Sequence, residues 1–527
     1  MSQILLYYRR PDPTTWVYMS SFLTIGLFFV FHRFWSIRNL DVFLLILLAP
    51  GLLVVHEGYR RQLIEAESVA RQKQEPPRPE QTTKAVTSLF SAFPILSIAP
   101  LDGPSSIASD NSIANDDSLA DDDSIANDSL AESAEPVGES SEEADRSAGP
   151  VPQYSPTDIR RWGFIYLFFV EALLMLRLML DPLMVRRPLL DPNLTTGGLN
   201  FIGISLFIFM MANVVASNPR IQVTQGPELG PGYAMMNMLP SIPTRPVSDE
   251  LGGASPPTTA ELTASQTQLA QLAKALAILA HLAIVTGIVL IGNRHFSNLR
   301  AGVGCATLYL ILPYTAQMTG RVDHALPAAL LLWAVLCYRK PLIAGIFLGL
   351  AGGLVYYPLF LLPLWISFYW KRGVRPFVVG VVVMLGMLVV ALSFDNSTTS
   401  LTEHLQQMFG LLNPNKEANE LSGIWGLGWN PIWRLPVIVA FVILSVFFAI
   451  WPAQKNLGTL MTGSAAVMVA AQFWHGYGGG GGLYIAWFLP LLLLTIFRPN
   501  LQDRIATKVV VAKSNRFWGS QSEISPV

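Results

Sequence analysis

Residues 317–375 read QMTGRVDHALPAALLLWAVLCYRKPLIAGIFLGLAGGLVYYPLFLLPLWISFYWKRGVR, and this stretch decides the class of fold. It holds three apolar runs, at 324–338, 342–355 and 358–370, and basic residues follow the first and the last of them. Apolar runs flanked by Lys and Arg are typical of helices that cross a bilayer. Proline disfavours a helical conformation in the residue before it, so the turn at Tyr357-Pro358 is predicted to separate two helices.

The same pattern extends through most of the chain. Of the 527 residues, 51% are hydrophobic and 13% are charged, with a mean hydropathy of +0.42. Soluble globular proteins carry about 25% charged residues. The other apolar runs lie at 14–31, 39–55, 162–180, 201–217, 270–291, 299–313, 376–394, 435–451, 457–473 and 483–497. We therefore predict an all-α, polytopic transmembrane helix bundle of about 12 or 13 spans, the number depending on the break within 342–370.

Composition divides the chain into hydrophobic units and polar linkers. In chain order, the predicted parts are a two-span unit (1–56), a disordered linker (57–160), a two-span unit with a polar Asp/Arg loop (161–217), a loop rich in Pro, Gly and Ser (218–268), a multi-span core (269–497) and a basic cytoplasmic tail (498–527). The first linker contains an acidic hexapeptide repeat, SIASDN-SIANDD-SLADDD-SIANDS, whose period of six suits neither a helix nor a strand. Such a segment buries too little apolar surface to fold alone, and it is a candidate binding segment for a protein partner.

The charges predict an orientation for the C-terminal half, in a multi-pass protein of the plasma or inner membrane. Arg339-Lys340, 371–375 and the tail after Phe497 are expected in the cytoplasm. The loops 314–323, 395–434 and 474–482 then face outward. The N-terminal half stays open at this point, because Arg160-Arg161 and strict alternation from the tail give opposite answers.

Several chemistries are excluded or unsupported. The sequence has no glycine-rich phosphate loop, no HExxH and no GxSxG motif. Its two cysteines, Cys305 and Cys337, are too few for a disulfide framework or a Cys-based metal site. We predict no metal and no cofactor. The net charge of −1 averages an acidic stretch with a basic remainder, and it gives no indication of nucleic-acid binding.

Two polar clusters beside apolar runs are the candidates for chemistry. The loop 181–193 holds Asp181, Arg187 and Asp191, and the turn at 320–324 holds Arg321, Asp323 and His324. Arginine binds phosphate oxygens bidentately, and an aspartate can act as a general base, so either cluster would suit a lipid-phosphate substrate. The alternative for both is ordinary capping of helix ends at the membrane interface.

The stretch 317–375 resembles the multi-span type C glycosyltransferases, especially their polyprenol-phosphate-mannose-dependent branch. The similar pieces are the polar patch Arg321–Asp323, the basic turn Arg339-Lys340, the small-residue run 344–351, the aromatic-Pro turn Tyr357-Pro358 and Leu361-Leu362-Pro363. Members of that branch often carry a Lys just before the aromatic-Pro turn, where this chain has Val355-Tyr356.

The resemblance implies transfer of a sugar, with mannose the first candidate, from a polyprenyl-phosphate donor to an acceptor on the outer face. It places a catalytic carboxylate in the first outward loop, which would make Asp181 or Asp191 the general base. Arg187 or Arg321 would then bind the lipid phosphate. Asp323, His324, Tyr357 and His475 would line the same site, and Trp429 would carry the acceptor sugar or belong to an interfacial aromatic belt.

Two other functions remain open from sequence: a transporter or flippase for a lipid-linked substrate, and a non-catalytic membrane scaffold. A transporter should show paired broken helices in two similar halves, and only the break at 355–358 is visible. The transferase hypothesis makes a stricter demand. It predicts one outward pocket that joins the 181–193 loop, the 321–324 turn and the 356–358 break, and without that pocket it ranks below the scaffold.

Overall fold

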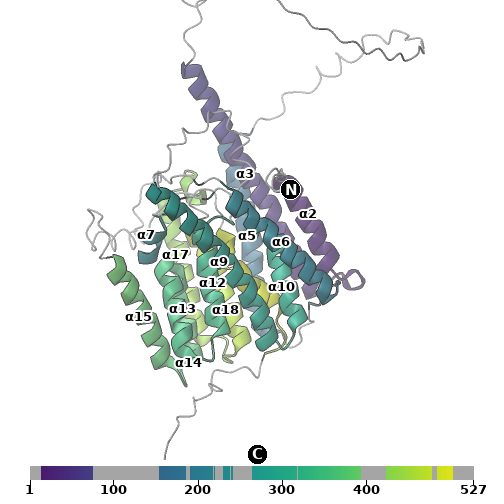
Figure 1. The fold of residues 1–527 in the computed structure, drawn as a ribbon, viewed down its shortest axis with the longest axis vertical. Coiled ribbons are helices and arrows are strands. Elements are labelled where there is room, and N and C mark those ends of the chain that lie inside the picture. Colours follow the sequence, from purple (N-terminus) through teal and green to yellow (C-terminus); the bar gives the residue numbers. More distant parts are fainter. Residues whose placement is uncertain are drawn as a thin grey trace, which may run out of the picture. The chain divides into compact units, whose positions relative to one another are not determined.

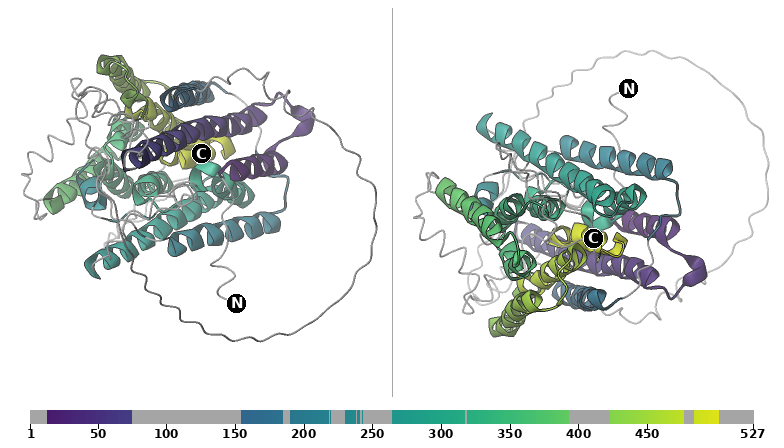
Figure 2. Two further views of the ribbon diagram at one scale, coloured as in Figure 1. Left: turned by 90° about the horizontal axis from the view of Figure 1, so that it is seen from above. Right: turned by 90° about the horizontal axis from the view of Figure 1, so that it is seen from below.

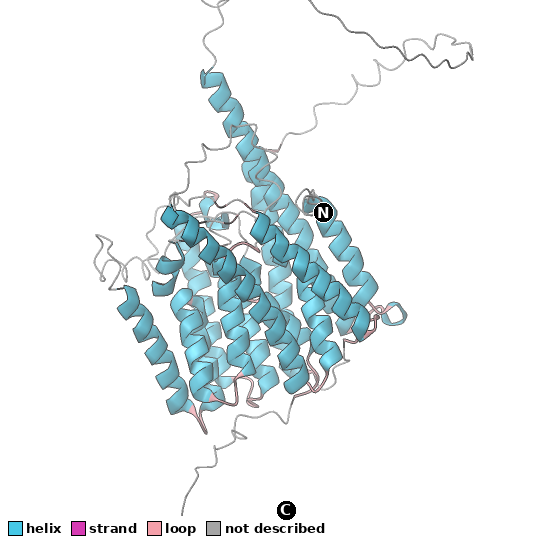
Figure 3. Cartoon of the chain, viewed as in Figure 1, coloured by secondary structure: helices cyan, strands magenta, loops and turns pink. Residues whose placement is uncertain are grey.

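The computed structural model describes residues 13–74, 154–184, 190–217, 219, 230–237, 239–240, 242, 264–316, 319–392, 423–476 and 484–501. All regular elements within these residues are helical (Figure 3). The chain divides into two units, residues 1–65 with 155–527 and residues 66–154. The helices discussed below belong to the first unit, apart from the last turns of α3. The all-α prediction is confirmed.

The helices follow the predicted apolar runs closely. The N-terminal ones are α2 (Pro13–Phe28), α3 (Ile37–Gln74), α5 (Pro156–Leu180), α6 (Thr196–Ala216) and the short α7 (Pro231–Asn237). The remaining ones are α9 (Ala264–Arg294), α10 (Leu299–Ile311), α11 (Pro313–Ala316), α12 (Val322–Leu336), α13 (Pro341–Leu354), α14 (Leu362–Tyr369), α15 (Val374–Leu392), α17 (Arg434–Ile450), α18 (Leu457–His475) and α19 (Leu489–Phe497). Short 3-10 turns include η2 (Asp181–Leu183), η3 (Tyr357–Leu361), η5 (Gly423–Gly426), η6 (Pro431–Trp433) and η7 (Tyr484–Trp487).

Six of these helices are long and apolar enough to cross a membrane. They cover 37–66, 156–183, 196–216, 264–294, 374–391 and 457–475. Five shorter apolar helices, at 299–311, 322–336, 341–354, 357–369 and 434–450, lie among them. The chain is therefore a multi-pass membrane protein.

Two predicted linkers are shorter than expected. The helix α3 continues past the predicted boundary at residue 56 to Gln74. Nothing between Gly58 and Gln74 breaks a helix, and Glu57 forms an ion pair with Arg61 one turn later, at 2.8 Å. The loop 218–268 contains α7 and the first residues of α9. The acidic repeat at 106–129 lies outside the described residues.

The predicted break between α13 and α14 is confirmed. Val355 is extended, with φ −140° and ψ 123°, and η3 begins two residues later. The chain then runs back antiparallel to α13, because the Tyr369 hydroxyl donates to the backbone oxygen of Tyr338, 2.6 Å away and just before α13 begins. The basic turns 339–340 and 371–375 therefore lie at the same end of the bundle, which we call the basic end.

The glycines of α13 explain its close packing against α15, which is visible in Figure 1. A Cβ atom added to Gly345 would lie 2.1 Å from the backbone oxygen of Phe377, and one added to Gly349 would lie 2.7 Å from that of Val381. Gly380 of α15 is equally close to α13, with its Cβ position 2.4 Å from the Leu342 oxygen. Small residues allow two membrane helices to approach backbone to backbone.

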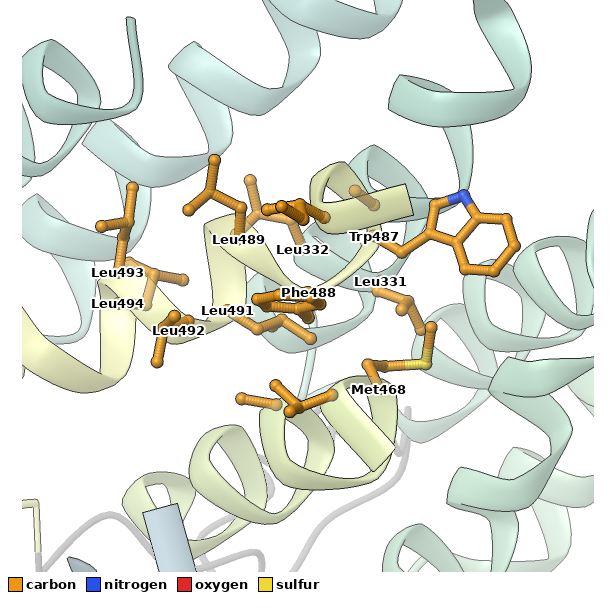
Figure 4. Close-up of a cluster of buried hydrophobic side chains, with 14 of the residues drawn as sticks. Leu331, Leu332, Met468, Trp487, Phe488, Leu489, Leu491, Leu492, Leu493 and Leu494 are labelled. Carbon is orange, nitrogen blue, oxygen red and sulfur yellow. The ribbon is translucent and has the colours of Figure 1, made fainter. Parts of the chain in front are cut away.

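The core lies where α12, α18 and α19 meet. A close-up shows Leu331 and Leu332 of α12, Met468 of α18 and the run from Trp487 to Leu494 packed together (Figure 4). Of the apolar window in α18, 94% is buried, and small residues such as Gly463 and Ala466 make that close packing possible. Views from both ends show α6 next to α9, away from α15 and α17 (Figure 2). Because almost all of its apolar window is buried, α18 is the central helix. Both polar sites described below contact this helix or its ends.

Candidate functional site

A group of polar and aromatic side chains gathers at the start of α12, which lies at the end of the bundle opposite the basic end. We call it the Asp323 cluster; its members are Arg321, Asp323, His324, Tyr357, His475, Tyr484 and Trp487. They come from α12, η3, α18 and η7, so four segments far apart in sequence meet there.

Asp323 is the centre of the cluster. The Arg321 Nε donates to its Oδ1 at 3.1 Å and the Arg321 Nη2 to its Oδ2 at 2.6 Å, which is a bidentate pair. The indole nitrogen of Trp487 donates to the backbone oxygen of Asp323 at 3.0 Å. Only 3% of Asp323 is exposed, so its carboxylate is buried, while Arg321 is partly exposed. Among the described residues from 264 to 501, Asp323 is the sole carboxylate.

Aromatic rings surround this charge pair. Tyr484 stacks on His324 with ring centroids 4.3 Å apart and on Trp487 with centroids 4.1 Å apart. The ring of His475 contacts both aromatic members of η7, with centroids 4.7 Å from Tyr484 and 5.6 Å from Trp487. The Tyr357 hydroxyl lies 3.5 Å from the Nδ1 of His475, which brings the aromatic-Pro turn into the cluster. The site therefore combines a carboxylate, a guanidinium and two imidazoles with apolar ring faces.

The short helix α7 adds a tyrosine that sequence reasoning missed. Burial raises the pKa of Tyr233 well above its ordinary value, and the neighbouring Tyr484 and Asp323 raise it further. Its hydroxyl therefore stays protonated and can donate a hydrogen bond. Glycine brings α7 this close, because a Cβ atom at Gly230 would lie 2.6 Å from the Gly353 oxygen at the end of α13. The pattern Gly230-Pro231-Gly232-Tyr233 is the one sequence signal for this approach.

The other predicted carboxylate, Asp181, belongs to a separate charge network. Its Oδ1 accepts from the Arg177 Nη1 at 3.1 Å, and its Oδ2 accepts from the Thr462 hydroxyl at 2.8 Å and from Arg498. Arg177 also pairs with Asp41, Nε to Oδ1, at 2.7 Å. Asp181 is 0% exposed. These four charges balance one another, so the group ties α3, α5 and the end of α19 together.

The prediction of one pocket for all three segments is wrong. Thr462, the partner of Asp181, and His475, in the Asp323 cluster, lie thirteen residues apart on α18, which is about 20 Å along a helix. Asp181 is therefore at the basic end, whereas Asp323 is at the other. Three apolar runs, an odd number, separate 181–193 from 321–324 along the chain, and an odd number of crossings places two loops on opposite faces.

Asp191 lies at the basic end as well. Arg38 donates to its backbone oxygen, and the Nη2 of Arg300 donates to the next backbone oxygen, that of Pro192, at 2.8 Å. Pro192 in turn packs against Gly304 in the middle of α10, where an added Cβ atom would lie 2.5 Å from its ring and 3.4 Å from Phe497. Arg187 lies outside the described residues. The structure thus joins Arg321, Asp323, His324, Tyr357 and His475, and it separates Asp181 and Asp191 from them.

Trp429 lies on the segment that connects η5 with η6. The segment is held to the end of α18 by a hydrogen bond from the Ile424 nitrogen to the Gly476 oxygen, at 2.8 Å. The indole nitrogen of Trp425 donates to the Phe473 oxygen at 3.3 Å, while 39% of Trp429 is exposed. Trp429 is therefore an accessible ring at the same end as Asp323. Among the residues that the structure describes, no three His, Cys, Asp or Glu side chains gather as metal ligands do.

One family model matches part of the chain. Residues 255–473 match the family model of glycosyltransferase family 87. The match supports a multi-span membrane glycosyltransferase. It includes the start of α12, the aromatic-Pro turn and α18, and it excludes Asp181 and Asp191. No curated protein and no solved structure matches the chain.

Proposed function

We propose that this chain is a membrane glycosyltransferase that uses a polyprenyl-phosphate sugar as donor, because residues 255–473 match glycosyltransferase family 87. Without the joint pocket, the sequence argument alone ranks a scaffold above a transferase, and the family match reverses that order. The sugar, with mannose the first candidate, is transferred to an acceptor on the outer face of the membrane. Reaction at the outer face follows from the charges, since the positive-inside rule puts the basic end in the cytoplasm. A lipid-linked donor suits the site, whose polar groups lie among the ends of apolar helices.

Asp323 is the general base in this proposal, in place of Asp181 and Asp191. The observation that carries the assignment is its position as the sole carboxylate among the described residues from 264 to 501, within the cluster of Arg321, His324 and Tyr484. Asp181 is a poor candidate, because two guanidinium groups and a hydroxyl already occupy its oxygens.

The reaction is a single displacement with inversion. The acceptor hydroxyl attacks the anomeric carbon, its proton passes to Asp323, and the bond from that carbon to the phosphate oxygen breaks. The polyprenyl phosphate leaves with both electrons of that bond. A carboxylate has about four lone-pair sites, so Asp323 can accept from the hydroxyl while it remains paired with Arg321. Arg321 uses Nε and Nη2 for this pair, which holds the Asp323 carboxylate in place.

Trp429 and His475 have supporting roles in the proposal. The exposed ring of Trp429 offers an apolar face on which a sugar can pack. His475 lies against the Tyr357 hydroxyl, where it can hold that hydroxyl in place for a hydrogen bond to substrate.

The test is a transfer assay with the purified protein in lipid nanodiscs. Radiolabelled polyprenyl-phosphate mannose is supplied first, followed by other polyprenyl-phosphate sugars, together with a lipid extract as the source of acceptors. Asp323→Asn should reduce transfer by about 10²-fold or more, the usual contribution of a general base. Asp323→Glu keeps the charge and should keep a measurable rate. Wild-type protein that transfers no sugar from any of these donors would contradict the proposed function.

Controls separate catalysis from folding. Glu57→Gln removes an exposed carboxylate that pairs with Arg60 and Arg61, and it should leave transfer unchanged. Each variant is first checked by size-exclusion chromatography and thermal unfolding. An Asp323→Asn protein that is folded and fully active would remove Asp323 from the mechanism, while the transferase function would stand.

A further inference from the structure

Arg434, the first residue of α17, is a buried arginine that the mechanism above does not use. It begins a stripe of buried residues, Arg434, Ile438, Phe441, Ser445 and Phe448, whose spacing of three and four places them on one face of the helix. That face packs against η3: Phe441 contacts the ring of Tyr357, with centroids 6.4 Å apart, and the Ser445 hydroxyl donates to the Phe360 oxygen. Only 5% of Arg434 is exposed.

No described residue forms an ion pair with Arg434, and its buried Nε has no hydrogen-bond partner among them. The groups that act on its guanidinium electrostatically are the hydroxyls of Tyr357 and Tyr356. Arg498, the other described arginine that is equally buried, contacts the Asp181 carboxylate. A buried guanidinium without an anion is costly inside a membrane protein, which indicates that an anion binds there when the protein works.

We propose that Arg434 binds the phosphate group of a phosphate-bearing ligand, next to Tyr356 and Tyr357. The planar guanidinium suits the bidentate recognition of phosphate oxygens. The hydroxyls of Tyr356 and Tyr357 are further hydrogen-bond donors near it. In this chain Val355-Tyr356 precedes the aromatic-Pro turn and provides no cation. Arg434 supplies the positive charge to that turn from a different helix. The identification of the ligand as the polyprenyl phosphate of the donor rests on the proposed function.

This position gives Arg434 and Asp323 different tasks. Tyr357 contacts His475 and the Trp487 ring, and Trp487 in turn donates to the Asp323 backbone. The phosphate held by Arg434 would thus lie on one side of these rings, and the carboxylate that takes the proton on the other. Arg434 would bind donor and leaving phosphate, whereas Asp323 would act on the acceptor.

The test measures binding to the full-length protein in detergent. The probes are farnesyl phosphate, its neutral alcohol farnesol, and inorganic phosphate. Wild-type protein should bind farnesyl phosphate more tightly than farnesol, and Arg434→Gln should weaken that binding tenfold or more. The affinity of Arg434→Lys for farnesyl phosphate should lie between those of wild type and Arg434→Gln, because lysine keeps the charge and loses the bidentate geometry. Arg60→Gln removes an exposed arginine and should bind as wild type does.

Stability without ligand provides an independent readout. If Arg434 has no protein anion, then Arg434→Gln should unfold at the same temperature as wild type or higher, and only wild type should gain stability from farnesyl phosphate. An Arg434→Gln protein that unfolds at a lower temperature, or that binds farnesyl phosphate like wild type, would overturn the proposal. If a low concentration of inorganic phosphate displaces farnesyl phosphate from the wild-type protein, the phosphate group alone is recognised. If it does not, the ligand is a lipid phosphate.

The two proposals can fail separately. Transfer that depends on Asp323 and not on Arg434 would refute the phosphate site and keep the transferase. Binding of farnesyl phosphate that depends on Arg434, in a protein that transfers no sugar, would keep the phosphate site and refute the transferase.

Discussion

Asp181 is the residue whose replacement best separates a structural role from a catalytic one. Asp181→Asn keeps the shape of the side chain and removes one of the four balanced charges shared by Asp41, Arg177, Asp181 and Arg498. Breaking a buried ion pair by removing one partner costs about 3–5 kcal/mol. In this variant Arg177 keeps its 2.7 Å contact with Asp41, so Arg498 is the main residue that loses its ionic partner. We therefore expect a destabilisation at the lower end of this range. About 3 kcal/mol corresponds to roughly a 10²-fold change in the unfolding equilibrium.

The assay is reversible unfolding in mixed micelles, followed by tryptophan fluorescence, alongside the transfer reaction. Asp181→Asn should be clearly destabilised, and its folded fraction should transfer sugar at the wild-type rate. The double variant Asp181→Leu/Arg498→Leu removes both charges and should recover most of the stability, because apolar replacement of a whole buried pair is often neutral. Wild-type stability combined with abolished transfer in Asp181→Asn would refute this reasoning and restore Asp181 as a catalytic residue.

Two further predictions concern the membrane and the helix packing. Reporter fusions after residue 340 and after residue 510 should both report the cytoplasm, because Lys and Arg cluster there, and opposite locations would contradict the antiparallel arrangement of α13 and α14. Gly345→Leu should destabilise the bundle by roughly 1–3 kcal/mol or more, because its Cβ would lie 2.1 Å from a backbone oxygen of α15; Gly386→Leu, where nothing lies within 4 Å, is the matched control and should unfold like wild type.

The course of the helices could be read from the sequence because it depends on local features. The break before Pro358 follows from the steric effect of proline on its neighbour, and the apolar runs mark the helices directly. The partners of charged residues could not be read in this way. Asp41, for example, pairs with Arg177, 136 positions away along the chain.

The full set of members of the functional site could not be predicted from local sequence either. The loop at 181–193 and the turn at 321–324 carry similar residues, so local composition makes them look like parts of one site. Their placement depends on how many spans lie between them, and that number is odd. Tyr233 and Arg434 were not predicted at all, because a lone tyrosine in a loop and an arginine at a helix start are common. Their significance lies in which side chains surround them after folding.

The shortness of α12 has a consequence for how substrates arrive. Its 15 residues span only about 22 Å, compared with roughly 30 Å for the hydrocarbon layer of a bilayer. If its basic end lies at the cytoplasmic boundary, as the clustered Lys and Arg predict, the helix would stop about 8 Å short of the opposite headgroups. A water-soluble sugar would have to leave water to reach Asp323, whereas a molecule already dissolved in the outer leaflet needs only to diffuse sideways. The depth of the site would therefore sort substrates by their partition into lipid before any side chain recognises them.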